Sequence, residues 1–359
     1  MYGRNRTPLS TYPAERIALL KPSALGDIIH CLPVLTALRQ RYPRAHITWV
    51  VNKVYEPLLR GHPDLDDTLP LDRRASRRGW WAATGSWLRF LGELRRRRFD
   101  LVLDLQGLAR TALMVLATGA RRRVGLGAAR EGARWTYTDV LPVSDNQSLR
   151  AVDRYWRAAE ALGVGDVPRR FRIPIPESAH RWAEATTRGL PRPWLMIGPG
   201  ARWPTKRWPT EHFAALARRA QDAFGGTVFF VGGDDERPLA ESVRHGLTGP
   251  SRDWTGRTTL PQLAALLERA DVMLANDTGP LHLADALGRP VVAPYTCTRV
   301  WSHGPYNSPR GAIESTVACQ GSYLKRCSRM VCMAELTPDR LWPALYEVLR
   351  SWSMPSRCG

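Results

Sequence analysis

The feature that most constrains this 359-residue chain is an alternation of short apolar runs with longer stretches of helical period, which occurs twice. In the first series, strands are expected at 17–20, 46–51 and 101–105, and helices at 27–41, 80–98, 109–117 and 151–162. In the second series, strands are expected at 194–197, 227–231, 272–275 and 290–294, and helices at 210–224, 236–245, 260–269, 280–287 and 337–352. Such alternation is typical of parallel α/β sheets.

Between the two series, residues 168–176 are rich in Pro and Arg and show no helical period, which indicates a linker. We therefore expect a Rossmann-like domain at 1–170, a linker at 171–178, a second Rossmann-like domain at 179–336, and a closing helix and tail at 337–359. Two doubly wound halves are expected to face a central cleft. Ligands bind such sheets at the carboxyl ends of the strands, so functional residues should directly follow strands.

The net charge of the chain narrows the classes of molecule that it could bind. The chain has 52 basic and 33 acidic residues, a formal net charge of +19, and residues 1–178 account for +13 of it. Such a field favours nucleic acid, an acidic membrane surface or a phosphorylated substrate. Residues 1–16 lack the apolar core of a signal peptide, and the longest apolar runs fall far short of the roughly 20 residues that span a bilayer. A cytoplasmic protein is expected.

The sharpest motif is residues 276–284 (NDTGPLHLA), which follow an expected strand and open a helix. A helix start offers unpaired N–H groups and a positive dipole end, which suit a diphosphate. We expect Gly279 as the N-cap, with His282 one turn further adding a hydrogen bond. The alternative is a well-capped helix with a packing histidine.

A second motif, residues 198–209 (GPGARWPTKRWP), also joins a strand to a helix. Its Lys206 stands between two tryptophans, and an ammonium held beside a diphosphate would stabilise charge on a leaving group. Taken alone, Lys206 is better explained as a solvated loop lysine, and that explanation weakens if the loop lies opposite the first motif in the same half.

A third motif, residues 21–30 (KPSALGDIIH), follows the first strand. Asp27 stands at the helix start, where it could act as a general base toward a sugar hydroxyl. Acidic residues are also common in the first turn of any helix, because the dipole favours them there.

Taken together, these three segments resemble glycosyltransferase family 9, the ADP-heptose:lipopolysaccharide heptosyltransferases. Residues 104–108 (DLQGL) are similar to the acceptor-domain motif of the enzyme that adds the first heptose. The resemblance implies a GT-B fold with the acceptor site in the first half and the donor site in the second. It implies inverting transfer from an ADP-sugar to an anionic glycolipid acceptor, without a metal or other cofactor.

The resemblance also implies roles for individual residues. Asp27 becomes the catalytic base. The acceptor-side candidates are Lys21, Ser23, Gly26 and Gln106. The donor-binding candidates are Lys206, Asp277, Thr278, Gly279, His282 and, on the nucleotide ribose, Glu236, with Asp235 as its competitor.

The basic first half would then suit a phosphorylated lipid acceptor, through the runs at 73–78, 95–98 and 121–123. Contact with the cytoplasmic face of the inner membrane is a further expectation. Arg202 departs from the family pattern, in which small hydroxyl residues often line the phosphate site. The segment at 296–307 has no assignment.

Two possible metal sites are weak. Residues 64–66 match an Asp-x-Asp pattern but lie in a turn-like run, and Cys319, Cys327 and Cys332 lack zinc-ribbon spacing. The cysteines are expected to pack or to be idle thiols, with a metal or redox role as the alternative.

Other readings keep the fold but change the function. One is the same chemistry with a different nucleotide sugar or glycan acceptor, and another is a non-catalytic binding module. A nucleic-acid-binding protein would fit the charge, but no signature of one is found. A dinucleotide oxidoreductase is disfavoured because no Gly-x-Gly-x-x-Gly follows the first strand.

Overall fold

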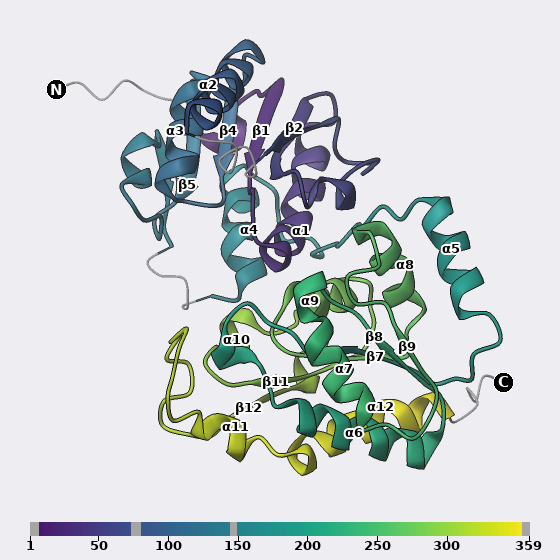
Figure 1. Cartoon of the computed structure of the whole chain (residues 1–359). Coiled ribbons are helices and arrows are strands. Elements are labelled where there is room, and N and C mark those ends of the chain that lie inside the picture. Colours follow the sequence, from purple (N-terminus) through teal and green to yellow (C-terminus); the bar gives the residue numbers. More distant parts are fainter. Residues whose placement is uncertain (1–6, 73–79, 144–148, 354–359) are drawn as a thin grey trace. The chain divides into compact units, whose positions relative to one another are not determined.

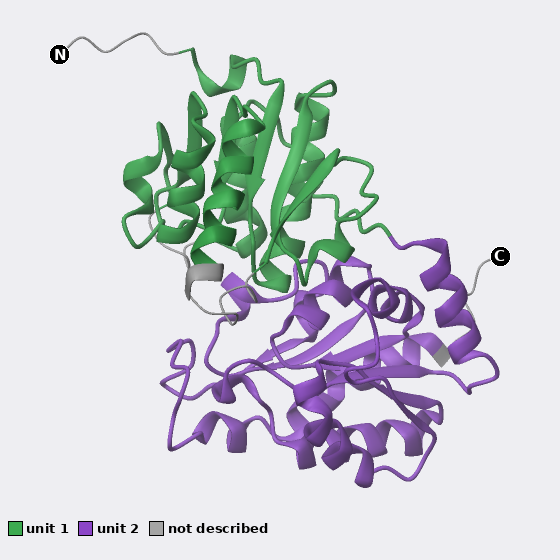
Figure 2. Cartoon of the chain, turned by 45° about the horizontal axis from the view of Figure 1, so that its top comes forward, with its two compact units in different colours: residues 1–174 green, residues 175–359 purple. Residues whose placement is uncertain are grey.

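The computed structural model describes residues 7–72, 80–143 and 149–353. The chain divides into two compact units, residues 1–174 and 175–359, which we call unit 1 and unit 2 (Figure 2). The division falls inside the stretch predicted as a linker, and residues 168–176 contain neither helix nor strand.

Unit 1 contains a six-stranded parallel sheet in the order β3-β2-β1-β4-β5-β6 (Figure 1). The strands are β1 (Arg16–Leu20), β2 (His46–Asn52), β3 (Asp67–Leu71), β4 (Leu101–Asp104), β5 (Arg122–Leu126) and β6 (Asp139–Leu141). The helices are α1 (Leu25–Arg41), α2 (Trp80–Arg96), α3 (Ala109–Thr118) and α4 (Ala151–Ala161). The strand order reverses between β1 and β4, which makes this the topological switch point of unit 1.

Helices cover both faces of this sheet. The connection β1-α1-β2 and the connection β4-α3-β5 run in opposite directions along the sheet, so right-handed crossovers place α1 and α3 on opposite faces. Helix α2 packs against α3, and α4 packs against α1. Ala18 and Leu20 of β1 share one core cluster with Met114 and Val115 of α3.

Unit 2 repeats the same strand order, here β12-β11-β10-β7-β8-β9, with its switch point between β7 and β10. The strands are β7 (Trp194–Gly198), β8 (Thr227–Phe230), β9 (Ser251–Asp253), β10 (Val272–Ala275), β11 (Val291–Tyr295) and β12 (Ala312–Glu314). The helices are α5 (Glu177–Thr187), α6 (Thr210–Phe224), α7 (Arg237–His245), α8 (Leu260–Arg269), α9 (Gly279–Ala286), α10 (Val300–His303), α11 (Val331–Glu335) and α12 (Pro338–Ser353).

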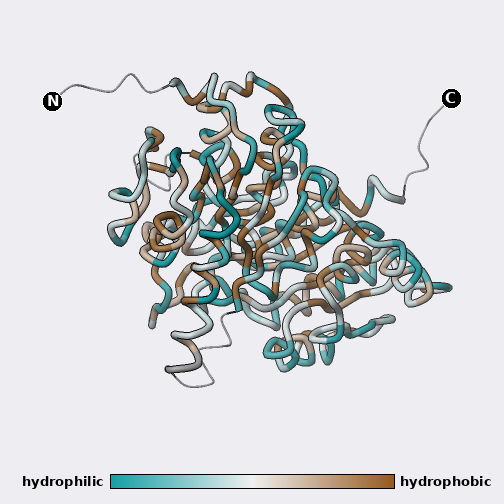
Figure 3. The backbone as a smooth tube through the Cα atoms, turned by 90° about the horizontal axis from the view of Figure 1, so that it is seen from above, coloured by the Kyte–Doolittle hydropathy of each residue, from teal (hydrophilic) through white to brown (hydrophobic). Residues whose placement is uncertain are grey.

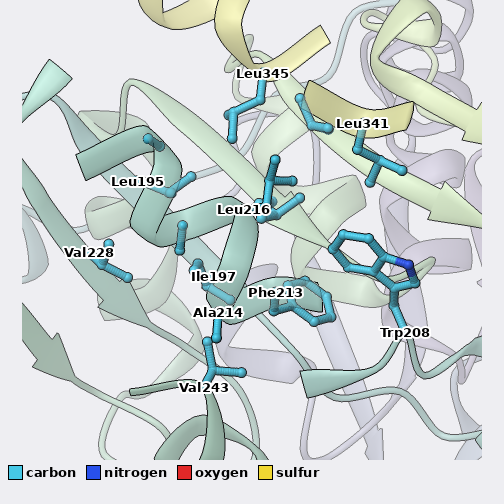
Figure 4. Packing of buried hydrophobic residues seen from close by; sticks show 14 of the residues in the cluster. Leu195, Ile197, Trp208, Phe213, Ala214, Leu216, Val228, Val243, Leu341 and Leu345 are labelled. Atoms are coloured by element: carbon cyan, nitrogen blue, oxygen red, sulfur yellow. The ribbon is translucent and has the colours of Figure 1, made fainter. Parts of the chain in front are cut away.

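The core of unit 2 includes the C-terminal helix. Leu341 and Leu345 of α12 pack with Leu216 of α6 and with strand residues such as Ile197 (Figure 4). Along the chain the hydropathy alternates between apolar and polar stretches, as expected for helices that bury a single face (Figure 3). Among the described residues, no helix combines the length and hydropathy that crossing a bilayer requires.

The sequence-based assignment missed five strands (β3, β5, β6, β9 and β12) and the helices α5, α10 and α11. Strands β6, β9 and β12 have three residues each, and β9 contains no apolar residue. Strands β3 and β6 close the edges of the first sheet, as β12 and β9 close those of the second, and edge strands need less apolar surface than central ones.

Candidate active site

Asp27 lies at the switch point of unit 1, in the first turn of α1, where hydrogen bonds fix its carboxylate. Oδ1 accepts a hydrogen bond from the Tyr155 hydroxyl at 2.7 Å, and Oδ2 accepts one from the Ala24 amide at 3.3 Å. The Nζ atom of Lys21 lies 3.8 Å from Oδ2. The Asp27 side chain is still 37% exposed, so it remains accessible to a ligand.

Lys21 supports this carboxylate from inside the unit. Its side chain is buried, and Nζ donates to the Leu105 carbonyl at 3.2 Å and to the Tyr155 hydroxyl at 3.0 Å. Burial alone would raise the pKa of Asp27, but Lys21 and the Tyr155 hydrogen bond outweigh it and hold that pKa well below its usual range. Burial would lower the pKa of Lys21, but Asp27 and Tyr155 raise it above its usual value. Both groups are therefore charged at neutral pH, and Lys21 acts by positioning Asp27.

Residues 104–108 form the loop after β4. The Asp104 side chain is fully buried, and its Oδ1 accepts from the amides of Gln106 at 2.9 Å and Gly107 at 3.0 Å, while Oδ2 accepts from the Tyr137 hydroxyl at 2.8 Å. Gly107 has φ +67°, and a Cβ there would lie 3.0 Å from Ala129, so glycine is required. Asp104 thus shapes the loop, and the backbone turn presents Gln106.

The acceptor-side candidates gather at the carboxyl ends of the two central strands of the first sheet, β1 and β4. Ser23 and Gly26 lie half-buried in the turn between β1 and α1. Gln106 follows β4, which pairs directly with β1. Its Oε1 is buried and has no hydrogen-bond partner among the described residues.

In unit 2, the carboxylate of Asp277 joins three side chains at the matching switch point. Oδ2 pairs with Lys206 Nζ at 2.5 Å and accepts from the Thr298 hydroxyl at 2.8 Å. The Nε2 atom of His282 lies 3.2 Å from Oδ1. Burial would raise the pKa of Asp277, but Lys206 and His282 outweigh it and hold that pKa far below its usual range. Asp277 therefore fixes the side chains of Lys206 and His282. The sequence analysis did not identify Thr298 as a partner of this carboxylate.

Helix α9 begins one residue earlier than predicted. Thr278 is the extended N-cap, and Gly279 is the first helical residue, so the expectation of Gly279 as N-cap is wrong. The Thr278 hydroxyl donates to the Asn276 carbonyl at 3.1 Å and does not cap the helix. The first-turn amides therefore receive no side-chain cap, and they remain available to an anion.

Asn276 connects the two loops of this switch point, although it was not singled out from sequence. Its side chain is fully buried. Its Nδ2 donates to the Pro199 carbonyl at 2.8 Å, and its Oδ1 accepts from the Trp208 amide at 3.0 Å. This fixes the Lys206 loop against the start of α9.

Glu236 ends the short 3₁₀ turn η6 (Asp234–Glu236) after β8. Its Oε2 accepts from the Gly233 amide at 3.0 Å. A Cβ at Gly200 would lie 2.0 Å from Glu236 Cδ, and one at Gly232 would lie 2.2 Å from its Oε2, so both glycines make room for this carboxylate. Burial raises its pKa. Asp235 is exposed, which favours Glu236 of the two candidates.

The carboxylates of residues 64–66 bind protein groups. Asp64 is buried and accepts from Thr36 at 2.8 Å and from Arg172 at 3.0 Å, and Asp66 pairs with Arg39. Cys319 and Cys327 are exposed, whereas Cys332 is buried in the core of unit 2. Within the described part of the chain, no group of three or more His, Cys, Asp or Glu side chains has a metal-binding arrangement.

The basic runs differ in character. The run at 73–78 lies outside the described residues. In the run at 95–98, Arg97 pairs with Asp67 and Glu93, and in the run at 121–123, Arg122 pairs with Asp139. The other arginines of these two runs are exposed or partly exposed.

The unassigned segment at 296–307 is anchored by Asp285 of α9. The buried Asp285 carboxylate accepts from the amides of Tyr306 at 2.7 Å and Ser308 at 2.8 Å. Arg202, the departure from the family pattern, is exposed on the Lys206 loop.

Residues 87–332 match the family model described as glycosyltransferase family 9 (heptosyltransferase). The chain belongs to this family. Among curated relatives it is 30% identical to lipopolysaccharide heptosyltransferase 1 of Pseudomonas aeruginosa, over 93% of this chain and 98% of that protein. It is 28% identical to the lipopolysaccharide core heptosyltransferase OpsX of Haemophilus influenzae, over 84% of each chain.

Solved structures agree on the fold. A family 9 glycosyltransferase of Veillonella parvula superposes with a TM-score of 0.81 at 23% identity, covering 94% of this chain and 98% of that one. The Escherichia coli heptosyltransferase WaaC with ADP superposes with a TM-score of 0.72 at 23% identity, covering 93% and 99%. The predicted family and GT-B fold are thus confirmed, and this family 9 chain is a glycosyltransferase.

Proposed function

We propose that this family 9 glycosyltransferase moves a heptose from ADP-heptose to an anionic lipopolysaccharide core acceptor, with inversion at the anomeric carbon. The named relatives are lipopolysaccharide heptosyltransferases, and WaaC is described with ADP. The observation that carries the proposal is that each unit has a charged group held by buried partners at its own switch point. Unit 1 holds Asp27 and unit 2 holds Lys206.

On the donor side, the ADP diphosphate would lie at the start of α9. The uncapped amides of its first turn and the Lys206 ammonium would bind the phosphate oxygens. Binding of a diphosphate would draw Lys206 between Asp277 and the ligand, so Asp277 would keep the ammonium in place without itself facing the anion. Glu236 would accept hydrogen bonds from the ribose hydroxyls.

On the acceptor side, Asp27 would accept the proton of the attacking hydroxyl. The acceptor oxygen forms a bond to the anomeric carbon, the bond from that carbon to the phosphate oxygen breaks, and ADP leaves with the electron pair. Lys206 and the α9 dipole offset the negative charge that develops on ADP. Gln106, in the loop after β4, would help to position the acceptor.

The acceptor chemistry also suggests where the protein works. A lipid-linked acceptor lies in a membrane, so we propose that the chain acts at the cytoplasmic face of the inner membrane. The positive charge of residues 1–178 suits both the acceptor and an anionic bilayer.

The test is ADP release from a panel of ADP-sugars with and without a lipid A–Kdo acceptor. Wild type should turn over ADP-heptose only with the acceptor, and Asp27→Asn should lose roughly two to four powers of ten in rate while binding ADP with unchanged affinity. If another ADP-sugar were turned over in preference to ADP-heptose, that sugar nucleotide would be the donor instead. Full activity of Asp27→Asn would remove this residue from the role of base.

A further inference from the structure

Helix α3 exposes an apolar stripe that the transfer reaction does not use. Leu113 is 51% exposed and Leu116 is 52% exposed, one turn apart on the helix. On the opposite side of the same helix, Met114 and Val115 are buried in the core of unit 1. The two leucines therefore point away from the sheet.

Two further exposed apolar side chains lie on elements that pack against α3. Trp135, in the 3₁₀ turn η4 (Ala133–Thr136), is 90% exposed, and Leu88 of α2 is 61% exposed. Helix α3 packs against both α2 and η4. Because Ala133 is buried beneath η4, Trp135 is presented on an anchored turn. We call Leu88, Leu113, Leu116 and Trp135 the α3 face.

The surroundings of the α3 face are strongly basic. Residues 80–136 contain eleven arginines and four acidic residues. Exposed arginines occur on or beside all three elements, namely Arg89, Arg95, Arg96, Arg110, Arg121, Arg130 and Arg134.

The four acidic residues all have partners within unit 1. Asp104 shapes its loop, Asp100 accepts from the Arg16 amide, Glu93 pairs with Arg97, and Glu131 accepts from the Ala109 amide. With eleven arginines and four carboxylates, the segment keeps a formal net charge of +7.

This combination identifies the kind of partner. Protein surfaces that enter the headgroup region of a bilayer typically combine exposed tryptophan and leucine side chains with nearby arginines. A second copy of the chain would bring the same positive field against itself, and nucleic acid would leave the leucines without a partner. We propose that the α3 face docks unit 1 on an anionic phospholipid bilayer. The proposal deepens the proposed function, since it supplies the membrane on which a lipid-linked acceptor would be met.

The test uses the full chain and sedimentation with vesicles. Wild type should bind vesicles of equal parts phosphatidylglycerol and phosphatidylcholine, and it should bind pure phosphatidylcholine much more weakly. The variant Leu113→Ser/Leu116→Ser/Trp135→Ser should lose affinity for the anionic vesicles by roughly tenfold or more. Arg110→Glu/Arg134→Glu should lose roughly tenfold or more, because it replaces two positive charges near the anionic surface with negative ones.

Trp352→Ser is the matched control, because Trp352 is a partly exposed tryptophan of α12 in unit 2. It should bind vesicles like wild type. Circular dichroism and thermal melting establish that each variant is folded. The proposal would be overturned if the wild-type protein did not bind anionic vesicles, or if the triple variant bound them like wild type. It would also be overturned if the triple substitution reduced only self-association of the protein.

A kinetic comparison separates this proposal from the proposed function. The triple variant should be slowed with acceptor embedded in anionic vesicles and should match wild type with a deacylated, water-soluble acceptor. If wild type turns over neither acceptor but still binds anionic vesicles through the α3 face, the proposed function fails and the docking surface stands. Equal rates for variant and wild type on the vesicles would contradict the docking surface alone.

Discussion

Tyr155 of α4 donates a hydrogen bond to Asp27 of α1 at 2.7 Å, although the two residues are 128 positions apart in the chain. Lys21 contacts both, so the three side chains form one closed network. The network keeps the carboxylate ionised and aimed, and it makes Tyr155 a positioning residue for the proposed base.

Replacement of Tyr155 should therefore change the pH dependence of the reaction. In Tyr155→Phe the pKa of Asp27 should rise toward its usual value, because the carboxylate loses its hydrogen bond. Activity requires the ionised form, so the acid limb of kcat/KM should move to higher pH, and the rate on the plateau should fall roughly tenfold. Steady-state kinetics across pH measure both. An unchanged acid limb together with a lower Tm would mean that Tyr155 has only a structural role.

Substitutions at Lys206 and Asp277 should affect kcat and the free energy of unfolding differently. Lys206→Ala should lower kcat by about two to three powers of ten, as expected on loss of a charge-stabilising donor. It should also lower the free energy of unfolding, because the Asp277 carboxylate is left buried without its cation. Adding Asp277→Asn should recover the free energy of unfolding but not kcat. If the double variant recovers kcat, Lys206 does not stabilise the leaving group.

Asp277 should also make stability depend on pH. Its folded-state pKa lies far below its unfolded value, so its contribution is fully present above the unfolded pKa of about 4 and is lost as the pH falls below it. Urea titrations from neutral to acid pH should show the free energy of unfolding falling in this range. Asp277→Asn should flatten the curve, whereas the exposed Asp222→Asn should leave its shape unchanged.

Glu236 should govern donor affinity. Glu236→Gln should weaken ADP binding by roughly tenfold, since a hydrogen bond to a charged group is replaced by one to a neutral amide. Gly200→Ala should have a similar effect, because its Cβ would displace the carboxylate. The exposed neighbour provides the control, and Asp235→Asn should bind ADP like wild type. Calorimetric titration with ADP measures all three, and equal losses in Glu236→Gln and Asp235→Asn would leave the ribose contact unassigned.

The sequence predicted the central strands other than β5, and the loops that follow them, because a buried parallel strand needs a continuous apolar run and a functional loop needs unusual residues. Strand β10 and helices α6 and α8 have the predicted bounds. The edge strands could not be found from apolar runs. Strand β9, for example, is three residues long and all three are polar.

Long-range partners were equally hidden from the sequence. Nothing local to Asp27 points to Tyr155, and nothing local to Asp277 points to Thr298. The burial of Lys21 also could not be anticipated, because a lysine after a strand is ordinarily solvated. The roles assigned to individual site residues thus remain predictions that the variants above will test.

The identical strand order of the two units has an evolutionary and practical consequence. Each half closes its own sheet around its own core, so the specificity for the nucleotide and the specificity for the glycan can diversify separately. Chimeric chains joined at Pro174–Ile175 with halves from related transferases should inherit the acceptor range of one parent and the donor of the other.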